Sequence, residues 1–125
     1  MPRQIIIRAD TLSLRAKLND TETAKKVFDS LPITGTVNTW GEEIYITTLI
    51  KAGPENPQGV VEIGDIGYWP PGSAVCLFFG KTPASKGDEI RPASPVNIIG
   101  KIMEDPKQLK QVKPRSTITI ETSSW

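Results

Sequence analysis

Prolines and glycines interrupt this sequence so often that it cannot form long regular elements. The 125 residues include eleven prolines and ten glycines, and both residue types favour turns over the interiors of helices and strands. Between these interruptions lie short runs rich in isoleucine, valine and threonine, whose branched Cβ atoms suit the pleated surface of a sheet. The sequence therefore predicts a single domain, residues 1–125, built mainly from short β-strands.

Alternating apolar and polar residues indicate where the strands lie. Residues 4–9 form a first candidate strand, and residues 11–18 follow with leucine or alanine at every second position. Asp10 lies between these two runs, so we expect them to form a hairpin. Later runs of the same kind predict strands over residues 36–40, 42–50, 60–63, 74–79, 96–103 and 117–122. The run at 74–79 is apolar throughout, which is typical of a strand that is buried on both faces.

Two short helices complete the expected architecture. The first follows the Asn-Asp-Thr sequence of residues 19–21, whose side-chain oxygens can cap a helix. Its apolar residues recur at helical spacing and share one face; they are Ala24, Val27, Phe28 and Leu31. The second helix is expected from Pro106 to about Val112, because proline is favoured at the first helical position.

These elements fit a closed barrel. The chain is too short for parallel β-α-β units throughout, and closure removes the exposed edges of short antiparallel strands. We therefore predict a mainly β protein, a closed antiparallel β-barrel of about eight strands with the two short helices capping its ends. Residues 81–95 are predicted to form a long surface loop, and a loop of this length in a compact domain is often functional.

Histidine is absent from the sequence, and Cys76 is its one cysteine. This composition excludes Ser-His-Asp and Cys-His catalysis, histidine-ligated zinc and an internal disulfide.

Fifteen basic and fourteen acidic side chains leave a net charge of +1, so the chain lacks the excess of positive charge that is typical of nucleic-acid-binding proteins. No apolar run approaches the roughly 20 residues of a membrane helix, and residues 1–7 lack signal-peptide architecture. We expect a cytoplasmic protein with no cofactor, no metal and no nucleic-acid or membrane partner.

The order of the elements and three motifs resemble the cyclophilin family. Residues 40–45 are Trp-Gly-Glu-Glu-Ile-Tyr, residues 64–72 place aromatic residues between Gly-Asp and Pro-Pro-Gly, and residues 78–83 are Phe-Phe-Gly-Lys-Thr-Pro. Over nearly its whole length the chain is similar to the small prokaryotic cyclophilin-like proteins of uncharacterised function. The resemblance implies a cyclophilin-like barrel. Isomerase cyclophilins carry an arginine that is central to their mechanism, whereas the corresponding stretch here, about residues 37–48, contains neither arginine nor histidine.

Aromatic and acidic residues gather in these motifs. Aromatic rings can stack on a ligand and attract a cation, and carboxylates can contact an amine. We therefore predict a non-classical cyclophilin-like protein that binds a small ligand or a peptide in a groove between residues 40–45, 68–72 and 78–83. The candidate binding residues are Trp40, Glu42, Glu43, Tyr45, Asp65, Tyr68, Trp69, Phe78, Phe79 and Thr82.

Several alternatives stay open at the level of sequence. Phe78 and Phe79 also fit a hydrophobic core, and Asp65 also fits a turn between two glycines. Adjacent residues of a strand point to opposite faces, so one of Glu42 and Glu43 can face the groove and the other cannot. The alternative functions are a weak or atypical peptidyl-prolyl cis-trans isomerase, and a subunit-interaction module that docks through the long loop, on a partner or in a homo-oligomer.

Overall fold

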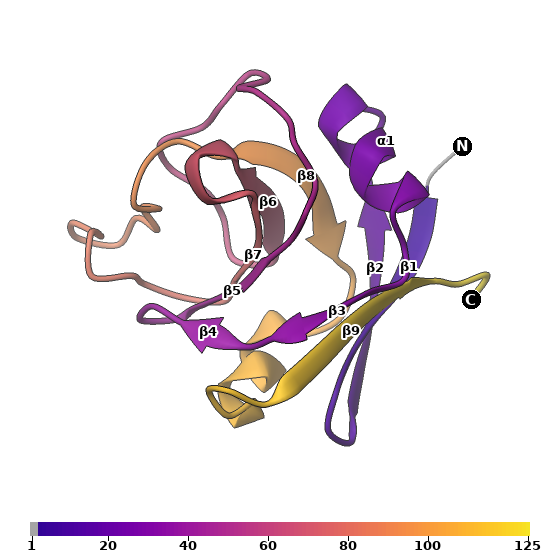
Figure 1. The fold of residues 1–125 in the computed structure, drawn as a ribbon. Coiled ribbons are helices and arrows are strands. Elements are labelled where there is room, and N and C mark those ends of the chain that lie inside the picture. The colour runs from indigo at the N-terminus through magenta and orange to yellow at the C-terminus, as the bar shows by residue number, and fades with distance from the viewer. Residues whose placement is uncertain (1–2) are drawn as a thin grey trace.

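A computed structural model describes residues 3–125, which form a nearly closed antiparallel barrel of nine strands (Figure 1). The elements in chain order are β1 (Arg3–Ala9), β2 (Leu12–Leu18), α1 (Glu22–Asp29), β3 (Ile33–Thr36), β4 (Asn38–Thr39), β5 (Glu43–Thr47), β6 (Asp65–Trp69), the 3₁₀-helix η1 (Pro70–Gly72), β7 (Ala74–Phe78), β8 (Asn97–Ile102), the 3₁₀-helix η2 (Pro106–Gln111) and β9 (Thr117–Thr122). Hydrogen bonds join the strands in the order β3-β9-β1-β2-β8-β6-β7-β5-β4. The mainly β, antiparallel barrel that the sequence predicts is confirmed.

One extended segment closes the barrel. The first and last strands of the sheet order, β3 and β4, are consecutive parts of residues 33–39. β3 pairs with β9, and β4 pairs with β5. Between them the Val37 N–H donates to the Ser116 carbonyl at 2.8 Å, and the Arg115 N–H donates to the Val37 carbonyl at 2.8 Å. The two ends of the sheet order, β3 and β4, are thus joined directly by the chain. This connection brings the sheet edges together and protects them from pairing with another chain.

The barrel interior holds one continuous apolar core. Every strand from β5 to β8 contributes side chains to it, and the hairpin of β1 and β2 does so at alternate positions. Helix α1 adds Ala24 and Val27, while Leu109 of η2 and the following Val112 pack into the same core. Both helices therefore bury an apolar face against the barrel, as the sequence predicts.

A buried amide connects α1 to the barrel wall. The Thr21 hydroxyl caps the helix by accepting a hydrogen bond from the Ala24 N–H at 3.1 Å. Asn97, at the start of β8, donates to the Thr23 hydroxyl at 3.1 Å and to the Gly53 carbonyl at 3.0 Å. Its side-chain oxygen accepts from the Glu55 N–H at 2.9 Å. The helix start and the loop that follows β5 are thus fixed to one strand.

Three boundaries differ from the sequence prediction. The expected strand over residues 42–50 ends at Thr47, because the Thr48 N–H and hydroxyl both turn to the Ser73 carbonyl. The prediction of a strand over residues 60–63 is wrong; the chain there makes one isolated bridge, from Val61, and then turns back. The strand expected at 36–40 begins earlier, at Ile33, and is divided into β3 and β4. The ninth strand is β6 (Asp65–Trp69), which was not predicted from the sequence.

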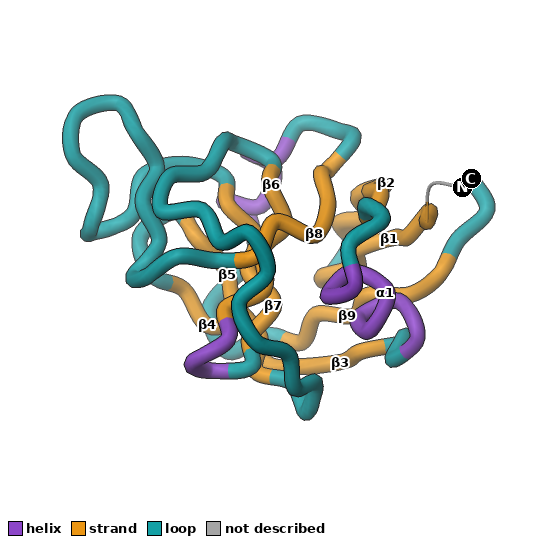
Figure 2. Tube along the Cα trace, turned by 90° about the horizontal axis from the view of Figure 1, so that it is seen from above, coloured by secondary structure: helices purple, strands orange, loops and turns teal. Residues whose placement is uncertain are grey.

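The long loop covers the outer face of the barrel beside β5, β6 and β7. Figures 1 and 2 show the loops of this region gathered on the side of the molecule away from β1 and β9. Beneath the loop lies a second apolar group, called here the outer cluster, which consists of Val61, Ala74, Cys76, Phe78, Ile90 and Val96. All five residues of β7 are consequently buried, which confirms the prediction of a strand covered on both faces.

Candidate functional site

The outer layer contains a pocket of about 180 Å³. Residues from the β4–β5 turn, from β5, β6 and β7, and from the end of the long loop form its walls. The lining residues are Trp40, Glu43, Tyr45, Trp69, Cys76, Pro92, Ala93 and Val96. The pocket therefore brings together segments that lie more than fifty positions apart in the sequence.

Strand alternation decides which glutamate faces the pocket. Ile44 and Ile46 of β5 point into the barrel core, so Glu43 and Tyr45 point outward. β5 pairs with β7 in a register that sets Tyr45 opposite Cys76. The Glu43 carboxyl and the Cys76 thiol therefore occupy the same outer face of neighbouring strands.

The β4–β5 turn places Trp40 beside Glu43. The Trp40 N–H donates to the Glu43 carbonyl at 2.9 Å, which closes a tight turn through Gly41. Gly41 has a φ of +63°, and a Cβ there would lie 2.9 Å from the Lys81 carbonyl oxygen. A side chain at this position would thus separate the turn from the start of the long loop. The glycine in the Trp-Gly-Glu-Glu motif allows these two segments to meet.

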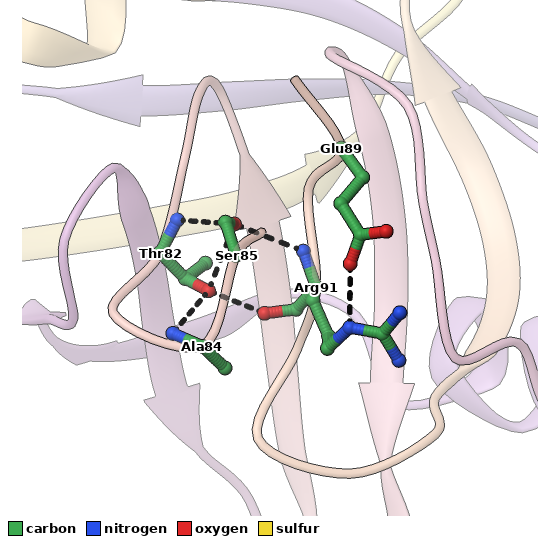
Figure 3. Close-up of polar contacts among 5 residues, drawn as sticks. All are labelled: Thr82, Ala84, Ser85, Glu89 and Arg91. Atoms are coloured by element: carbon green, nitrogen blue, oxygen red, sulfur yellow. Dashed lines mark hydrogen bonds and ion pairs between the residues drawn. The ribbon is translucent and has the colours of Figure 1, made fainter. Parts of the chain in front are cut away.

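Hydrogen bonds fix the loop that forms the opposite wall (Figure 3). The Thr82 hydroxyl donates to the Arg91 carbonyl and accepts from the Ala84 N–H at 3.2 Å. The Ser85 hydroxyl accepts from the Thr82 N–H at 3.0 Å and from the Arg91 N–H at 3.2 Å, while the Arg91 guanidinium donates to Glu89 at 2.5 Å. Thr82 does not line the pocket, but this network holds the backbone immediately before the wall residues.

Trp69 joins the barrel to the same loop. Its indole N–H donates to the Ser94 hydroxyl at 2.6 Å, so the ring at the end of β6 is held against residues 92–96. Trp40, Tyr45 and Trp69 are each half-buried, and all three line the pocket. The three aromatic rings therefore form part of the pocket lining.

Glu43 is the acidic group of the pocket, and it is buried. Its exposed fraction is 6%. Desolvation raises its pKa from 4.5 to about 7, and the neighbouring Cys76 thiol opposes part of that shift. Burial, together with the negative charge of Glu43, raises the pKa of the Cys76 thiol well above its ordinary value. Near neutral pH the carboxyl is thus divided between its protonated and ionised forms, while the thiol stays protonated.

The other acidic candidates lie elsewhere. Glu42 points away from the pocket and pairs with Lys110 at 3.2 Å. Asp65 accepts a hydrogen bond from the Glu62 N–H at 2.8 Å in the turn before β6, and pairs with Lys101 at 3.1 Å. Both carboxylates therefore have partners within the fold, and Asp65 occupies the turn position that the sequence left as its alternative.

The remaining aromatic candidates are packed inside the protein. Tyr68 lies in the barrel core, where its hydroxyl donates to the Ile50 carbonyl at 2.6 Å. Phe79 belongs to the same core, and Phe78 belongs to the outer cluster behind the pocket. Of the ten candidates, the four that the structure brings together in the pocket wall are Trp40, Glu43, Tyr45 and Trp69.

Four lining residues were not among the sequence candidates. Cys76 is one of them, and its alternation in β7 places it beside Tyr45. The other three are Pro92, Ala93 and Val96, at the end of the long loop. The signal that could have identified this loop segment is the apolar run of β7, because a strand buried on both faces needs a covering segment outside the barrel.

Neither a metal centre nor a membrane-spanning helix is found in the part of the chain that the structure describes. Among residues 3–125, no group of three or more His, Cys, Asp or Glu side chains could hold a metal ion. No helix over the same range is long and apolar enough to cross a membrane.

Comparison with known proteins agrees with the fold. The family model described as Cyclophilin-like matches residues 3–121. The solution structure of a hypothetical protein from Archaeoglobus fulgidus is similar to this chain, with a TM-score of 0.83 and 42% sequence identity, covering 98% of this chain and 95% of that one. No curated protein matches the sequence. The match over nearly the whole length shows that the chain belongs to the cyclophilin-like family.

Proposed function

We propose that this protein is a non-classical cyclophilin-like binding protein whose outer pocket takes a small ligand or a side chain of a peptide. The observation that carries the proposal is the combination of three half-buried aromatic rings and one buried carboxyl in a single pocket. Pockets that bind small molecules are concave and mostly apolar, with few polar groups that orient the ligand. The pocket around Glu43 has this composition.

The absence of the isomerase arginine supports binding rather than classical catalysis. The stretch that corresponds to the arginine-bearing strands of isomerase cyclophilins supplies Trp40, Glu43 and Tyr45 to this pocket. None of the eight lining residues is an arginine or a lysine. A fold shared with isomerases does not by itself supply their chemistry.

A chemical-shift titration of the ¹⁵N-labelled protein tests the proposal. The probes are small amines, cyclic alcohols and short proline- or lysine-containing peptides. We expect at least one probe class to shift the amide signals of the pocket residues, and Ala93→Phe to weaken that binding by narrowing the pocket at an exposed position. Gln111→Phe is the matched control, since it adds the same bulk to an exposed residue of η2. Pocket signals that stay unchanged at millimolar concentrations of every probe would contradict the proposal.

A second candidate, an atypical prolyl isomerase, is favoured by the raised pKa of Glu43. Rotation about the prolyl bond has a barrier of roughly 18–20 kcal/mol, and a hydrogen-bond donor near the prolyl nitrogen lowers it by weakening the amide resonance. A carboxyl donates when it is protonated, and burial raises the pKa of Glu43 to about 7. Any isomerase rate that depends on this group should fall as the pH rises from 6 to 8. A cis-trans peptide assay with no rate above background at pH 6 would exclude this candidate.

A further inference from the structure

Glu43 differs from the other buried acidic side chain of the protein. Asp65 is 8% exposed and has Lys101 at 3.1 Å, whereas Glu43 is 6% exposed and, among residues 3–125, has no basic side chain within 4.0 Å. The neighbouring Glu42, which is half-exposed, also has a basic partner in Lys110. Burying a charge without a partner is strongly unfavourable. The pocket thus contains a carboxyl that the fold leaves without a counter-charge.

The surroundings of Glu43 restrict what could partner it. The pocket walls are aromatic or aliphatic apart from the Cys76 thiol, the Tyr45 hydroxyl and the carboxyl itself. An anionic ligand would find a like charge and no basic side chain among the lining residues. A purely apolar ligand would bury the carboxyl further without giving it a partner. A cation suits both the carboxyl and the aromatic walls, because it pairs with the carboxylate and is attracted to the faces of the aromatic rings.

The pocket volume limits the size of that cation. At about 30 Å³ for each water-sized group, a pocket of 180 Å³ holds about six non-hydrogen atoms. Pockets for drug-sized molecules are larger, roughly 300–1,000 Å³. The occupant is therefore either a compact free molecule or one side chain of a larger one.

We infer that the pocket recognises a compact organic ammonium group, with its N–H directed to the Glu43 carboxylate and its apolar part against Trp40, Tyr45 and Trp69. This inference rests on the proposed binding function and specifies its ligand class. The ammonium comes either from a small free amine or from a lysine side chain of a peptide. Both sources present the same chemistry to the pocket, and the experiment separates them.

Binding of a cation is coupled to ionisation of Glu43. The titratable groups that share the pocket with it are Tyr45 on β5 and Cys76 on β7, while the loop wall adds none. Burial raises the pKa of the Cys76 thiol well above its ordinary value, so the thiol stays protonated near neutral pH. The Glu43 carboxyl, with a pKa of about 7, is therefore the group that changes charge there. An ammonium ligand binds the ionised form and releases the proton. Its affinity should therefore increase by about tenfold between pH 6 and pH 8.

The decisive measurement compares isosteric probes at pH 8 by chemical-shift titration. Cyclohexylammonium carries the proposed group, cyclohexanol is its neutral counterpart, and a short lysine peptide is compared with the same peptide containing norleucine. We expect each cationic probe that binds to do so at least tenfold more tightly than its neutral counterpart. Glu43→Gln should abolish that preference, whereas the adjacent Glu42→Gln should leave it unchanged, because Glu42 faces away from the pocket.

The outcomes separate this inference from the function on which it rests. Equal affinities of the pocket for cyclohexylammonium and cyclohexanol, measured from the titration curves, would overturn the ammonium inference and leave the binding function standing. No shift with any probe would overturn both. Selective binding of the lysine peptide but not of cyclohexylammonium would support the inference and assign a peptide source, and the reverse result would assign a free amine.

Discussion

Replacing Glu43 with glutamine should make the protein more stable, and increasingly so as the pH rises. The carboxyl has a pKa of about 7 in the folded protein, whereas its ordinary value is 4.5. The folded state therefore holds a proton that the unfolded state has already released between these pH values, so the contribution of this group to stability falls as the pH rises from 4.5 to 7. Below pH 4.5 both states are protonated and the unfavourable contribution is absent.

The magnitude follows from the difference between the two pKa values. A pKa that is raised from 4.5 to about 7 corresponds to about 3 kcal/mol at high pH, of which about a quarter is already present at pH 5. The neutral Glu43→Gln variant lacks this pH-dependent cost. Its free energy of unfolding, relative to wild type, should thus increase by about 2–3 kcal/mol between pH 5 and pH 8.

Urea unfolding at pH 5 and pH 8 measures this difference directly. Glu42→Gln is the matched control, because it removes a half-exposed carboxylate at the neighbouring position. The relative stability of that control should change far less between the two pH values. If the difference between Glu43→Gln and wild type is the same at pH 5 and pH 8, the carboxyl is not desolvated as described, and the reasoning about its charge is refuted.

Three further substitutions test the packing of the outer layer and two of the hydrogen-bond networks described above. Gly67→Ala places a Cβ 3.0 Å from Val96 and should lower the free energy of unfolding by about 1–3 kcal/mol, measured in urea. Asn97→Ala removes three hydrogen bonds of a buried amide and should cost about 3 kcal/mol, with a lower thermal midpoint; a loss below about 0.5 kcal/mol would contradict that role. Thr82→Val removes the hydroxyl that holds the Arg91 carbonyl, and should accelerate amide hydrogen exchange in the long loop while the barrel strands keep their protection.

The barrel was more predictable from the sequence than the pocket. Strand alternation and branched residues reflect local preferences, so the hairpin around Asp10 and the buried run of β7 could be predicted from short windows. The order of these elements, together with three motifs, carried the resemblance to cyclophilins, and that resemblance implied the barrel. Alternation also established that Glu42 and Glu43 face opposite sides, but the choice between them needed the pairing of β5 with β7 and the content of the barrel core.

The pocket depends on contacts between distant residues. The wall residues at the end of the long loop are held by Thr82 and by the bond from Trp69 to Ser94, and these contacts carry no periodic signal in the sequence. Tyr68 and Trp69 illustrate the same limit: they are adjacent aromatic residues in one motif, yet one fills the barrel and the other lines the pocket. Residue type was enough to identify the candidate binding residues. Deciding which of them line the pocket required the strand pairing and packing of the folded protein.

The position of β9 has a consequence for biosynthesis. Among residues 3–125 this strand is the last in chain order, and it lies between β1 and β3, pairing with both. Until it emerges, the hairpin formed by the earliest part of the chain and the segment that seals the cylinder have no common neighbour. The nascent polypeptide therefore closes the barrel only after Thr122 has been synthesised, whatever part of the barrel has already formed.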